Sequence, residues 1–251
     1  MPYDLQLLKM GQCEVPGPEV YWMSHWNSWE LLYFWMILIR GNGKNIIINT
    51  GPPRDLAPLN KVWSEAVDPR SQFVRRPEEQ PEEALGRYGL SPGDIDFVLI
   101  TPLQAYTTGN IQIFRNATVC ISRRGWIVDF HAPKFPMHIP RKLRIPDNTL
   151  HYLEIESPER LRLLEDEEEV LPGLRAFWTG VHHRSSMAYA IETDRGTVIA
   201  SDCFFKYPNI EKMIPLGIME NLEECMRAYS RIKKEADILL PLYDPAVADN
   251  F

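Results

Sequence analysis

A β-hairpin near the N-terminus constrains the fold of this chain more than any other feature. The run YFWMILIR, residues 33–40, is followed by GNGK and then by NIIINTG, residues 45–51. Both arms are rich in β-branched and aromatic residues, and the Gly41-Asn42-Gly43 turn tolerates positive φ. The sequence therefore predicts a sheet that starts in the first fifth of the chain.

Further strands follow in two groups. Ile95–Pro102 is almost continuously apolar, which is typical of a buried strand, and residues 117–123 form a shorter strand-like run. Residues 130–146 carry several prolines and basic residues and are predicted to form a surface excursion. Between residues 150 and 202, five short runs alternate with turn residues: LHYLEI, RLRLLE, LRAFWTG, MAYAIET and GTVIASD. Helices are predicted over residues 56–67, 81–89 and 222–236. Two sets of strands, each followed by helices, predict two packed sheets with helices outside.

Composition excludes several classes of protein. The 251 residues include 27 basic and 34 acidic side chains and no long basic run, which argues against nucleic-acid binding. The most apolar stretch, residues 31–39, is too short to span a bilayer. The four cysteines are scattered, as in proteins of a reducing compartment, and no signal peptide is evident. A single cytoplasmic domain, residues 1–251, without nucleic-acid or membrane partners, is expected.

Four longer segments share their order and spacing with one known family. They are ILIRGNGKNIIINTGPP, LSPGDIDFVLITPLQAYTTGNIQIFRNATVCISRR, FWTGVHHRSSMAYAIETDRGTVIASD and NIEKMIPLGIMENLEECMRAYSRIKKEADILLPLYDPAV. Together they cover roughly residues 33–246 and resemble the metallo-β-lactamase fold superfamily, specifically its N-acyl-homoserine-lactonase-like branch. The resemblance implies an α/β (α+β) fold, a four-layer αββα sandwich.

The metal-binding positions of that family are altered here. The family's His-x-His-x-Asp-His loop is represented by Pro102, Gln104, Tyr106 and Thr107. Its last histidine is replaced by Tyr243, so that only His182 and Asp202 match. Zinc sites in proteins normally have three or four protein ligands, more than these two. The sequence therefore predicts no metal and no other cofactor.

By the resemblance, the remaining polar residues gather at one edge of the sandwich. His182 would act as general base or acid, and Asp202 would orient it. Tyr106 and Tyr243 would donate hydrogen bonds to a substrate carbonyl or a developing oxyanion. Gln104 and Thr107 are the neighbouring candidate substrate contacts. The alternative is that His182 and Asp202 are relics and the tyrosines only fill the space of the former metal site.

Two residues near this set have alternative interpretations, and a third has an expected orientation. Arg184 could bind a substrate carboxylate or phosphate, or could be an ordinary surface arginine. Cys203 could be a nucleophile, although strand alternation places it opposite Asp202 and favours a buried structural thiol. On an extended segment, His183 should point to the sheet face opposite His182.

An aromatic segment near the N-terminus completes the candidate site. VYWMSHWNSWELLYFW, residues 20–35, places several indoles around His25. The resemblance implies that this region walls the substrate cleft, with Trp22 and Trp26 stacking on a flat ligand and His25 as a polar contact.

The sequence thus predicts a metal-independent hydrolase or lyase. Its partner would be a cyclic, aromatic or acyl small molecule, such as a lactone, lactam or amide. The alternative is a catalytically inactive module that binds a small molecule or a protein. A metal-dependent lactonase with unfamiliar ligands is a third hypothesis, and a homodimer is compatible with all three.

Overall fold

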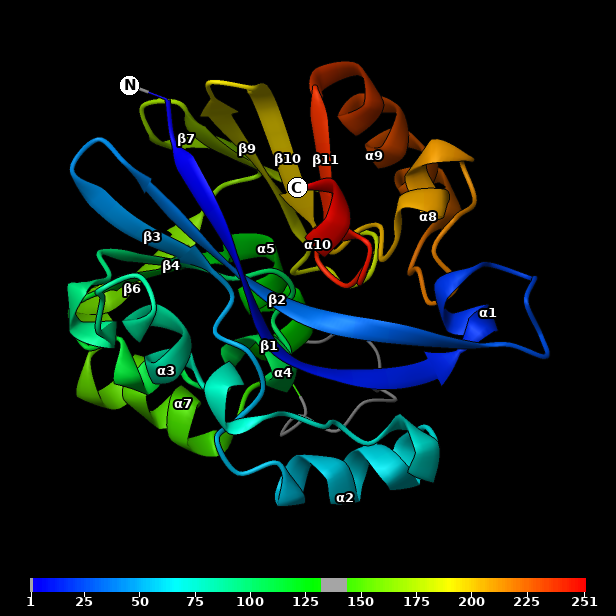
Figure 1. Cartoon of the computed structure of the whole chain (residues 1–251), viewed down its shortest axis with the longest axis horizontal. Coiled ribbons are helices and arrows are strands. Elements are labelled where there is room, and N and C mark those ends of the chain that lie inside the picture. The colour runs from blue at the N-terminus through cyan, green and yellow to red at the C-terminus, as the bar shows by residue number, and fades with distance from the viewer. Residues whose placement is uncertain (1, 132–143) are drawn as a thin grey trace.

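In the computed structural model, which describes residues 2–131 and 144–251, the strands form two sheets (Figure 1). The six-stranded sheet has the order β1 (Asp4–Pro16), β2 (Trp29–Gly41), β3 (Lys44–Ile48), β4 (Phe97–Leu99), β5 (Thr118–Ser122), β6 (Leu161–Leu164). The five-stranded sheet has the order β11 (Ile238–Pro241), β10 (Gly196–Ser201), β9 (Met187–Thr193), β8 (Leu174–Trp178), β7 (Glu167–Leu171).

Helices lie outside both sheets. On the side of the six-stranded sheet are α2 (Ala57–Ala66), α3 (Pro81–Gly86) and α7 (Asp147–His151), and on the side of the five-stranded sheet are α8 (Tyr207–Glu211) and α9 (Leu222–Glu235) (Figure 1). The shorter helices are α1 (Gly17–Val20), α4 (Ala105–Thr108), α5 (Arg123–Gly125) and α10 (Val247–Asn250). The π-helical turns are η5 (Trp126–His131) and η6 (Tyr152–Glu156), and the 3₁₀ turns are η1 (Pro69–Ser71), η2 (Pro77–Glu79), η3 (Pro92–Asp94), η4 (Ile111–Ile113) and η7 (Pro158–Arg160). The predicted αββα sandwich is confirmed. No described helix combines the length and the apolar character needed to cross a membrane.

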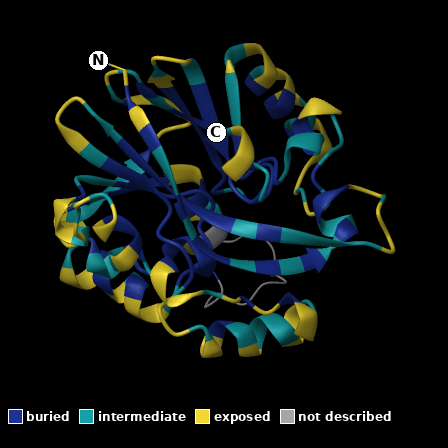
Figure 2. Ribbon diagram, viewed as in Figure 1, coloured by how far each residue is buried: buried dark blue, intermediate teal, exposed yellow. Residues whose placement is uncertain are grey.

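Strand direction explains where polar loops meet. β3, β4, β5 and β6 run parallel, as do β10 and β11. The carboxyl ends of parallel strands meet at one edge of a sheet, and ligand sites in α/β folds concentrate there. The strands themselves are mainly buried where the sheets face each other (Figure 2).

The predicted hairpin is confirmed, with Gly41 opposite Lys44 at its turn. The sequence did not indicate the strand β1, which pairs antiparallel with β2 of the hairpin from one end of β1 to the other. The register of this ribbon shifts between Lys9 and Gln12, where Gly11 has a φ of +131°. The resulting long ribbon extends well beyond the rest of its sheet (Figure 1).

Two predictions in the middle of the chain need correction. LHYLEI, predicted as a strand, is helical, spanning the end of α7 and most of η6. Thr149, Tyr152 and Leu153 are buried there, which is the i, i+3, i+4 spacing of a helix face. Most of the predicted surface excursion, residues 132–143, lies outside the described residues, but Arg144 and Ile145 are buried.

Candidate active site

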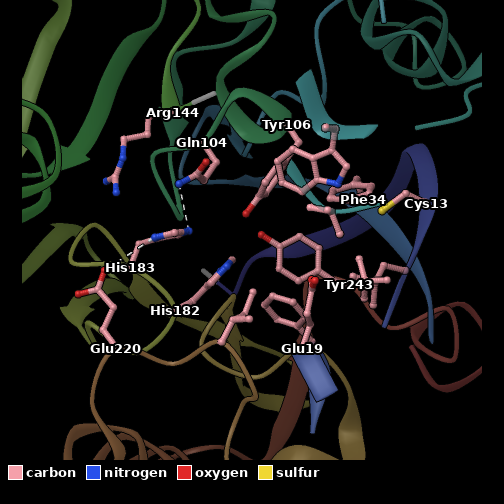
Figure 3. A pocket seen from close by; sticks show the side chains of 16 residues that line it. Cys13, Glu19, Phe34, Gln104, Tyr106, Arg144, His182, His183, Glu220 and Tyr243 are labelled. Carbon is pink, nitrogen blue, oxygen red and sulfur yellow. Dashed lines mark hydrogen bonds and ion pairs between the residues drawn. The ribbon is translucent and has the colours of Figure 1, made fainter. Parts of the chain in front are cut away.

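Segments that follow four strands converge at one edge of the sandwich. Gln104 and Tyr106 follow β4, His182 lies between β8 and β9, and Tyr243 follows β11. All four line one cavity (Figure 3). Asp202, directly after β10, lies beneath it and contacts His182. The structure therefore brings together five of the residues that the resemblance assigned to the site.

Asp202 is held by several hydrogen bonds. It is fully buried and accepts hydrogen bonds from the hydroxyls of Thr101 and Ser186, the latter at 2.6 Å. Its Oδ2 lies 3.2 Å from His182 Nδ1. Thr101 is in turn fixed by the side-chain amide of Asn49, which donates to its carbonyl and accepts from its N–H, both at 2.9 Å. Because Nδ1 faces Asp202, Nε2 is the nitrogen of His182 left for the cavity.

His183 lies beside His182, contrary to the expectation of opposite faces. The segment between β8 and β9 bends instead of running extended, and the two imidazole centroids are 4.1 Å apart. His183 Nε2 lies 3.0 Å from Gln104 Nε2, and its Nδ1 lies 3.9 Å from Glu220 Oε1. Burial lowers the pKa of His183 well below its usual value. Protonation of the adjacent His182 and the positive charges of Arg144 and Arg184 lower this pKa further. We therefore treat His183 as a neutral imidazole.

The cavity has a volume of about 340 Å³. Its walls are largely apolar and come from the β1–β2 ribbon, α2 and later loops, with contributions from Val15, Leu32, Phe34, Trp63, Phe205 and Ile218. The Phe205 ring lies edge-on to His182 and Tyr243, at centroid distances of 4.8 and 4.7 Å. Charged groups are poorly solvated in such surroundings, and the low dielectric constant strengthens electrostatic interactions inside the cavity.

The two tyrosines form the upper part of the cavity. Their ring centroids are 6.1 Å apart, and Phe34 packs against both. Burial raises the pKa of Tyr106 and of Tyr243 well above the ordinary value, and the charge of Asp202 raises both further. The Tyr243 hydroxyl is buried and makes no hydrogen bond of normal geometry to a residue that the structure describes. Both phenols are therefore neutral hydrogen-bond donors and not bases.

Sequence reasoning missed three charged residues of the cavity, which are Glu19, Arg144 and Glu220. Glu19, on the short helix α1, lines it, and burial raises the pKa of this carboxyl to about 7. Arg144 also lines the cavity, although it was assigned to a surface excursion. Nothing in the local patterns PGPEV or LRIPD distinguishes Glu19 or Arg144 from a surface charge. Their positions depend on long-range packing.

Two polar candidates do not line the cavity. The Arg184 guanidinium forms ion pairs with Glu220, at 2.6 Å, and with Glu224, and it stacks on Trp178 at 4.9 Å. Thr107 donates its hydroxyl to the Pro102 carbonyl at 2.6 Å. Arg184 therefore carries a structural ion-pair network, and Thr107 stabilises the loop that presents Gln104.

The predicted aromatic wall is also corrected. Trp22 is 42% exposed and Trp26 is 65% exposed, and His25 packs on Tyr21 at a centroid distance of 4.3 Å. This loop turns outward at the far end of the ribbon, with positive φ at Met23 and His25. Its side chains consequently face solvent, and the strands on either side of the loop, β1 and β2, supply the cavity wall.

Cys203 has the position expected of a structural thiol. It is fully buried, does not line the cavity, and burial raises its pKa well above the ordinary value. Cys13 does line the cavity, but burial raises the pKa of its thiol strongly as well. Neither thiol is therefore a ready nucleophile, because the thiolate is the reactive form.

The donor set does not fit a divalent metal centre. Among residues 2–131 and 144–251, no three histidine, cysteine, aspartate or glutamate side chains lie close enough together to hold a metal ion. The two matching residues, His182 and Asp202, form a hydrogen bond to each other, and Asp202 already accepts hydrogen bonds from two hydroxyl groups. Amide, phenol and proline side chains at the other positions are poor zinc ligands.

Comparisons with known proteins agree with this architecture. No protein-family model matches the sequence. An N-acyl homoserine lactonase from Bacillus cereus is 21% identical over 204 residues, which are 80% of this chain and 75% of that protein.

Solved structures are similar over the whole chain. An N-acyl homoserine lactone hydrolase, with the product N-hexanoyl-L-homoserine bound at its catalytic metal center, gives a TM-score of 0.77 at 19% identity and covers 100% of this chain and 97% of its own. The hydrolase AbOPH, of the beta lactamase superfamily, gives a TM-score of 0.66 at 13% identity, covering 95% of this chain and 86% of its own. With two sheets, outer helices and a site at the strand ends, this chain has the fold of the metallo-β-lactamase superfamily.

Proposed function

We propose that this chain hydrolyses a cyclic or acyl small molecule, of the lactone, lactam or amide class, in the cavity above His182. The observation that carries the proposal is the buried His182–Asp202 pair, 3.2 Å apart, at the base of a largely apolar cavity. The similarity of this chain in sequence and fold to N-acyl homoserine lactone hydrolases supports the same class of substrate.

The pair has the arrangement of a general base. With its proton on Nδ1, facing Asp202, His182 presents the lone pair of Nε2 to the cavity. Nε2 would take a proton from water as the water oxygen forms a bond to the substrate carbonyl carbon. The imidazolium, stabilised by Asp202, would then return that proton to the leaving oxygen or nitrogen as the bond to the carbonyl carbon breaks. A cyclic substrate would give one ring-opened acid.

Tyr243 would stabilise the negative charge that develops on the carbonyl oxygen. Its hydroxyl is buried, lies beside the Tyr106 hydroxyl and interacts with it, and makes no hydrogen bond of normal geometry to a described residue (Figure 3). A neutral phenol donor in a site of low dielectric constant acts as an oxyanion hole does. The raised pKa of Tyr243 keeps its proton in place.

Independence of metal is the part of the proposal that departs from the similar proteins. One of them is described with its product at a catalytic metal center, and this likeness weighs against the departure. The donor set weighs for it, because glutamine, tyrosine and threonine stand where a metal centre requires imidazole or carboxylate.

Elemental analysis of protein purified without chelator tests this part directly. We expect zinc, iron and manganese well below one ion per chain. A stoichiometric ion would show that other residues complete a centre, and would return the mechanism to metal-activated water.

Substitution tests the catalytic pair. His182→Ala and Asp202→Asn should each lower turnover of a lactone, lactam or aryl amide by about 10²–10⁴-fold, with EDTA having no effect on the wild type. His151→Ala, on an exposed histidine outside the cavity, is the matched control and should retain full activity. Full activity in both cavity variants would refute the mechanism. Binding without turnover by the wild type would favour the inactive binding module.

A further inference from the structure

Gln104 has a polar atom that makes no hydrogen bond within the part of the chain that the structure describes. The residue is 1% exposed and lines the cavity, yet its Oε1 makes no hydrogen bond to a described residue. Buried side-chain oxygens nearly always have a partner, and an exception calls for an explanation. A ligand that enters the cavity is the natural source of the missing donor.

The neighbouring hydrogen bond fixes which end of the amide is unpaired. Gln104 Nε2 lies 3.0 Å from His183 Nε2 (Figure 3). An amide nitrogen only donates, so His183 Nε2 must accept and its ring proton must be on Nδ1. Nδ1 faces the carboxylate of Glu220 at 3.9 Å, which favours that tautomer. This order of donors leaves Gln104 Oε1, an acceptor, as the unpaired group.

We infer that Gln104 selects ligands that present an N–H group, so that the substrate of this site is an amide or lactam in preference to a lactone. That the selected ligand is also a substrate rests on the proposed function. The selectivity of binding itself does not require turnover.

Tyr243 supplies the complementary half of this recognition. Its hydroxyl makes no hydrogen bond of normal geometry to a described residue and can donate to a carbonyl oxygen, while Gln104 Oε1 can accept from the amide nitrogen. An amide group carries both an acceptor and a donor, whereas the lactone group carries acceptors only. A lactone would thus satisfy Tyr243 and leave Gln104 unpaired on binding.

The expected selectivity is substantial because the site is buried. A site built to hydrogen-bond an N–H or O–H group discriminates against analogues that lack it, since its own polar group stays unpaired. For one neutral hydrogen bond, we expect a preference of about 10–100-fold in Kd.

Three bicyclic probes of matched shape test the inference by calorimetric titration. They are isoindolin-1-one, which has the N–H group, its N-methyl derivative, and phthalide, the corresponding lactone. The wild type should bind isoindolin-1-one about 10–100-fold more tightly than the other two. Gln104→Met, which keeps the side-chain length without an acceptor, should bind all three within about 3-fold of one another. Gln104→Glu, which keeps an acceptor, should retain the preference.

The control is Gln112→Met, because Gln112 lies outside the cavity and its Oε1 accepts a hydrogen bond from Thr149 at 3.1 Å. This variant should bind the probes as the wild type does. Equal affinities in the wild type, a preference that persists in Gln104→Met, or failure of all three probes to bind would each overturn the inference. Selective binding of isoindolin-1-one without its hydrolysis would leave the inference standing and contradict the proposed function alone.

Discussion

The two sides of the cavity differ in how completely their polar groups are paired. On one side, Asp202 accepts hydrogen bonds from Thr101 and Ser186 and contacts His182, while Asn49 fixes Thr101. On the other side, the Tyr243 hydroxyl and Gln104 Oε1 make no hydrogen bond of normal geometry to a described residue. The first arrangement is complete without a ligand, and the second is not.

This difference separates what the fold requires from what a ligand would require. A satisfied buried network stabilises one conformation and pre-orients its members. Unpaired buried groups lower stability, and proteins retain them mainly where function compensates. The network around Asp202 therefore positions the base His182. We expect Gln104 and Tyr243, on the other side, to recognise the substrate.

Removal of Asp202 should have the largest effect on stability. Asp202→Ala strips the shared acceptor from His182, Thr101 and Ser186, and we expect the free energy of unfolding to fall by about 3–5 kcal/mol. Urea denaturation of the wild type and of Asp202→Ala measures this difference in the free energy of unfolding. Asp4→Ala, which removes an exposed partner of Arg40, should cost less than about 1 kcal/mol. Similar losses in the two variants would mean that the Asp202 network is not the stabilising side.

Glu19 should make stability depend on pH near neutrality. Its pKa is raised from 4.5 to about 7 by burial, so the folded state holds this proton more tightly than the unfolded state. The stabilisation from this proton is complete below about pH 4.5 and is lost as the pH rises through about 7. Glu19→Gln should therefore unfold with less dependence on pH, gaining about 1–3 kcal/mol over the wild type between pH 4.5 and pH 8.

The control for this prediction is Glu14→Gln, one strand residue away from the cavity wall. A hydrogen bond from Arg70 lowers the pKa of Glu14, so its own pH dependence lies below 4.5. Unfolding of this variant between pH 5 and pH 8 should parallel that of the wild type. A Glu19→Gln variant that also parallels the wild type would show that Glu19 is solvated.

Sequence alone predicted the architecture because its signals are local. The hairpin of β2 and β3, the helix α9 and the strand β10 each have a periodicity or turn signal that suffices for assignment. The order of four segments then indicated the fold, and with it the meeting of His182, Asp202 and Tyr243. Strand β1 was missed, although its thirteen residues pair along β2.

Site residues outside those segments could not be predicted in this way. Trp22 and Trp26 were predicted to form a ligand wall because the resemblance assigns the N-terminal region to the substrate cleft, but the direction of a loop at the end of a ribbon is not encoded in a local pattern. Glu19 and Arg144 could not be distinguished from surface charges, because long-range packing and not a local pattern brings them to the cavity. His183 was misplaced because alternation holds only for extended backbone, and the segment after β8 bends.

The smallest predicted effect concerns two buried phenols that differ only in their pairing. The Tyr243 hydroxyl makes no hydrogen bond of normal geometry to a described residue, whereas the hydroxyl of Tyr189 donates to the Ile100 carbonyl at 3.0 Å. Tyr189→Phe should therefore lower the free energy of unfolding by about 1–2 kcal/mol, and Tyr243→Phe should leave it within about 0.5 kcal/mol of the wild type or raise it. Urea denaturation of both variants under one buffer condition makes the comparison. If Tyr243→Phe is as destabilising as Tyr189→Phe, the Tyr243 hydroxyl is paired in the free protein, and the two sides of the cavity are more alike than their hydrogen bonds indicate.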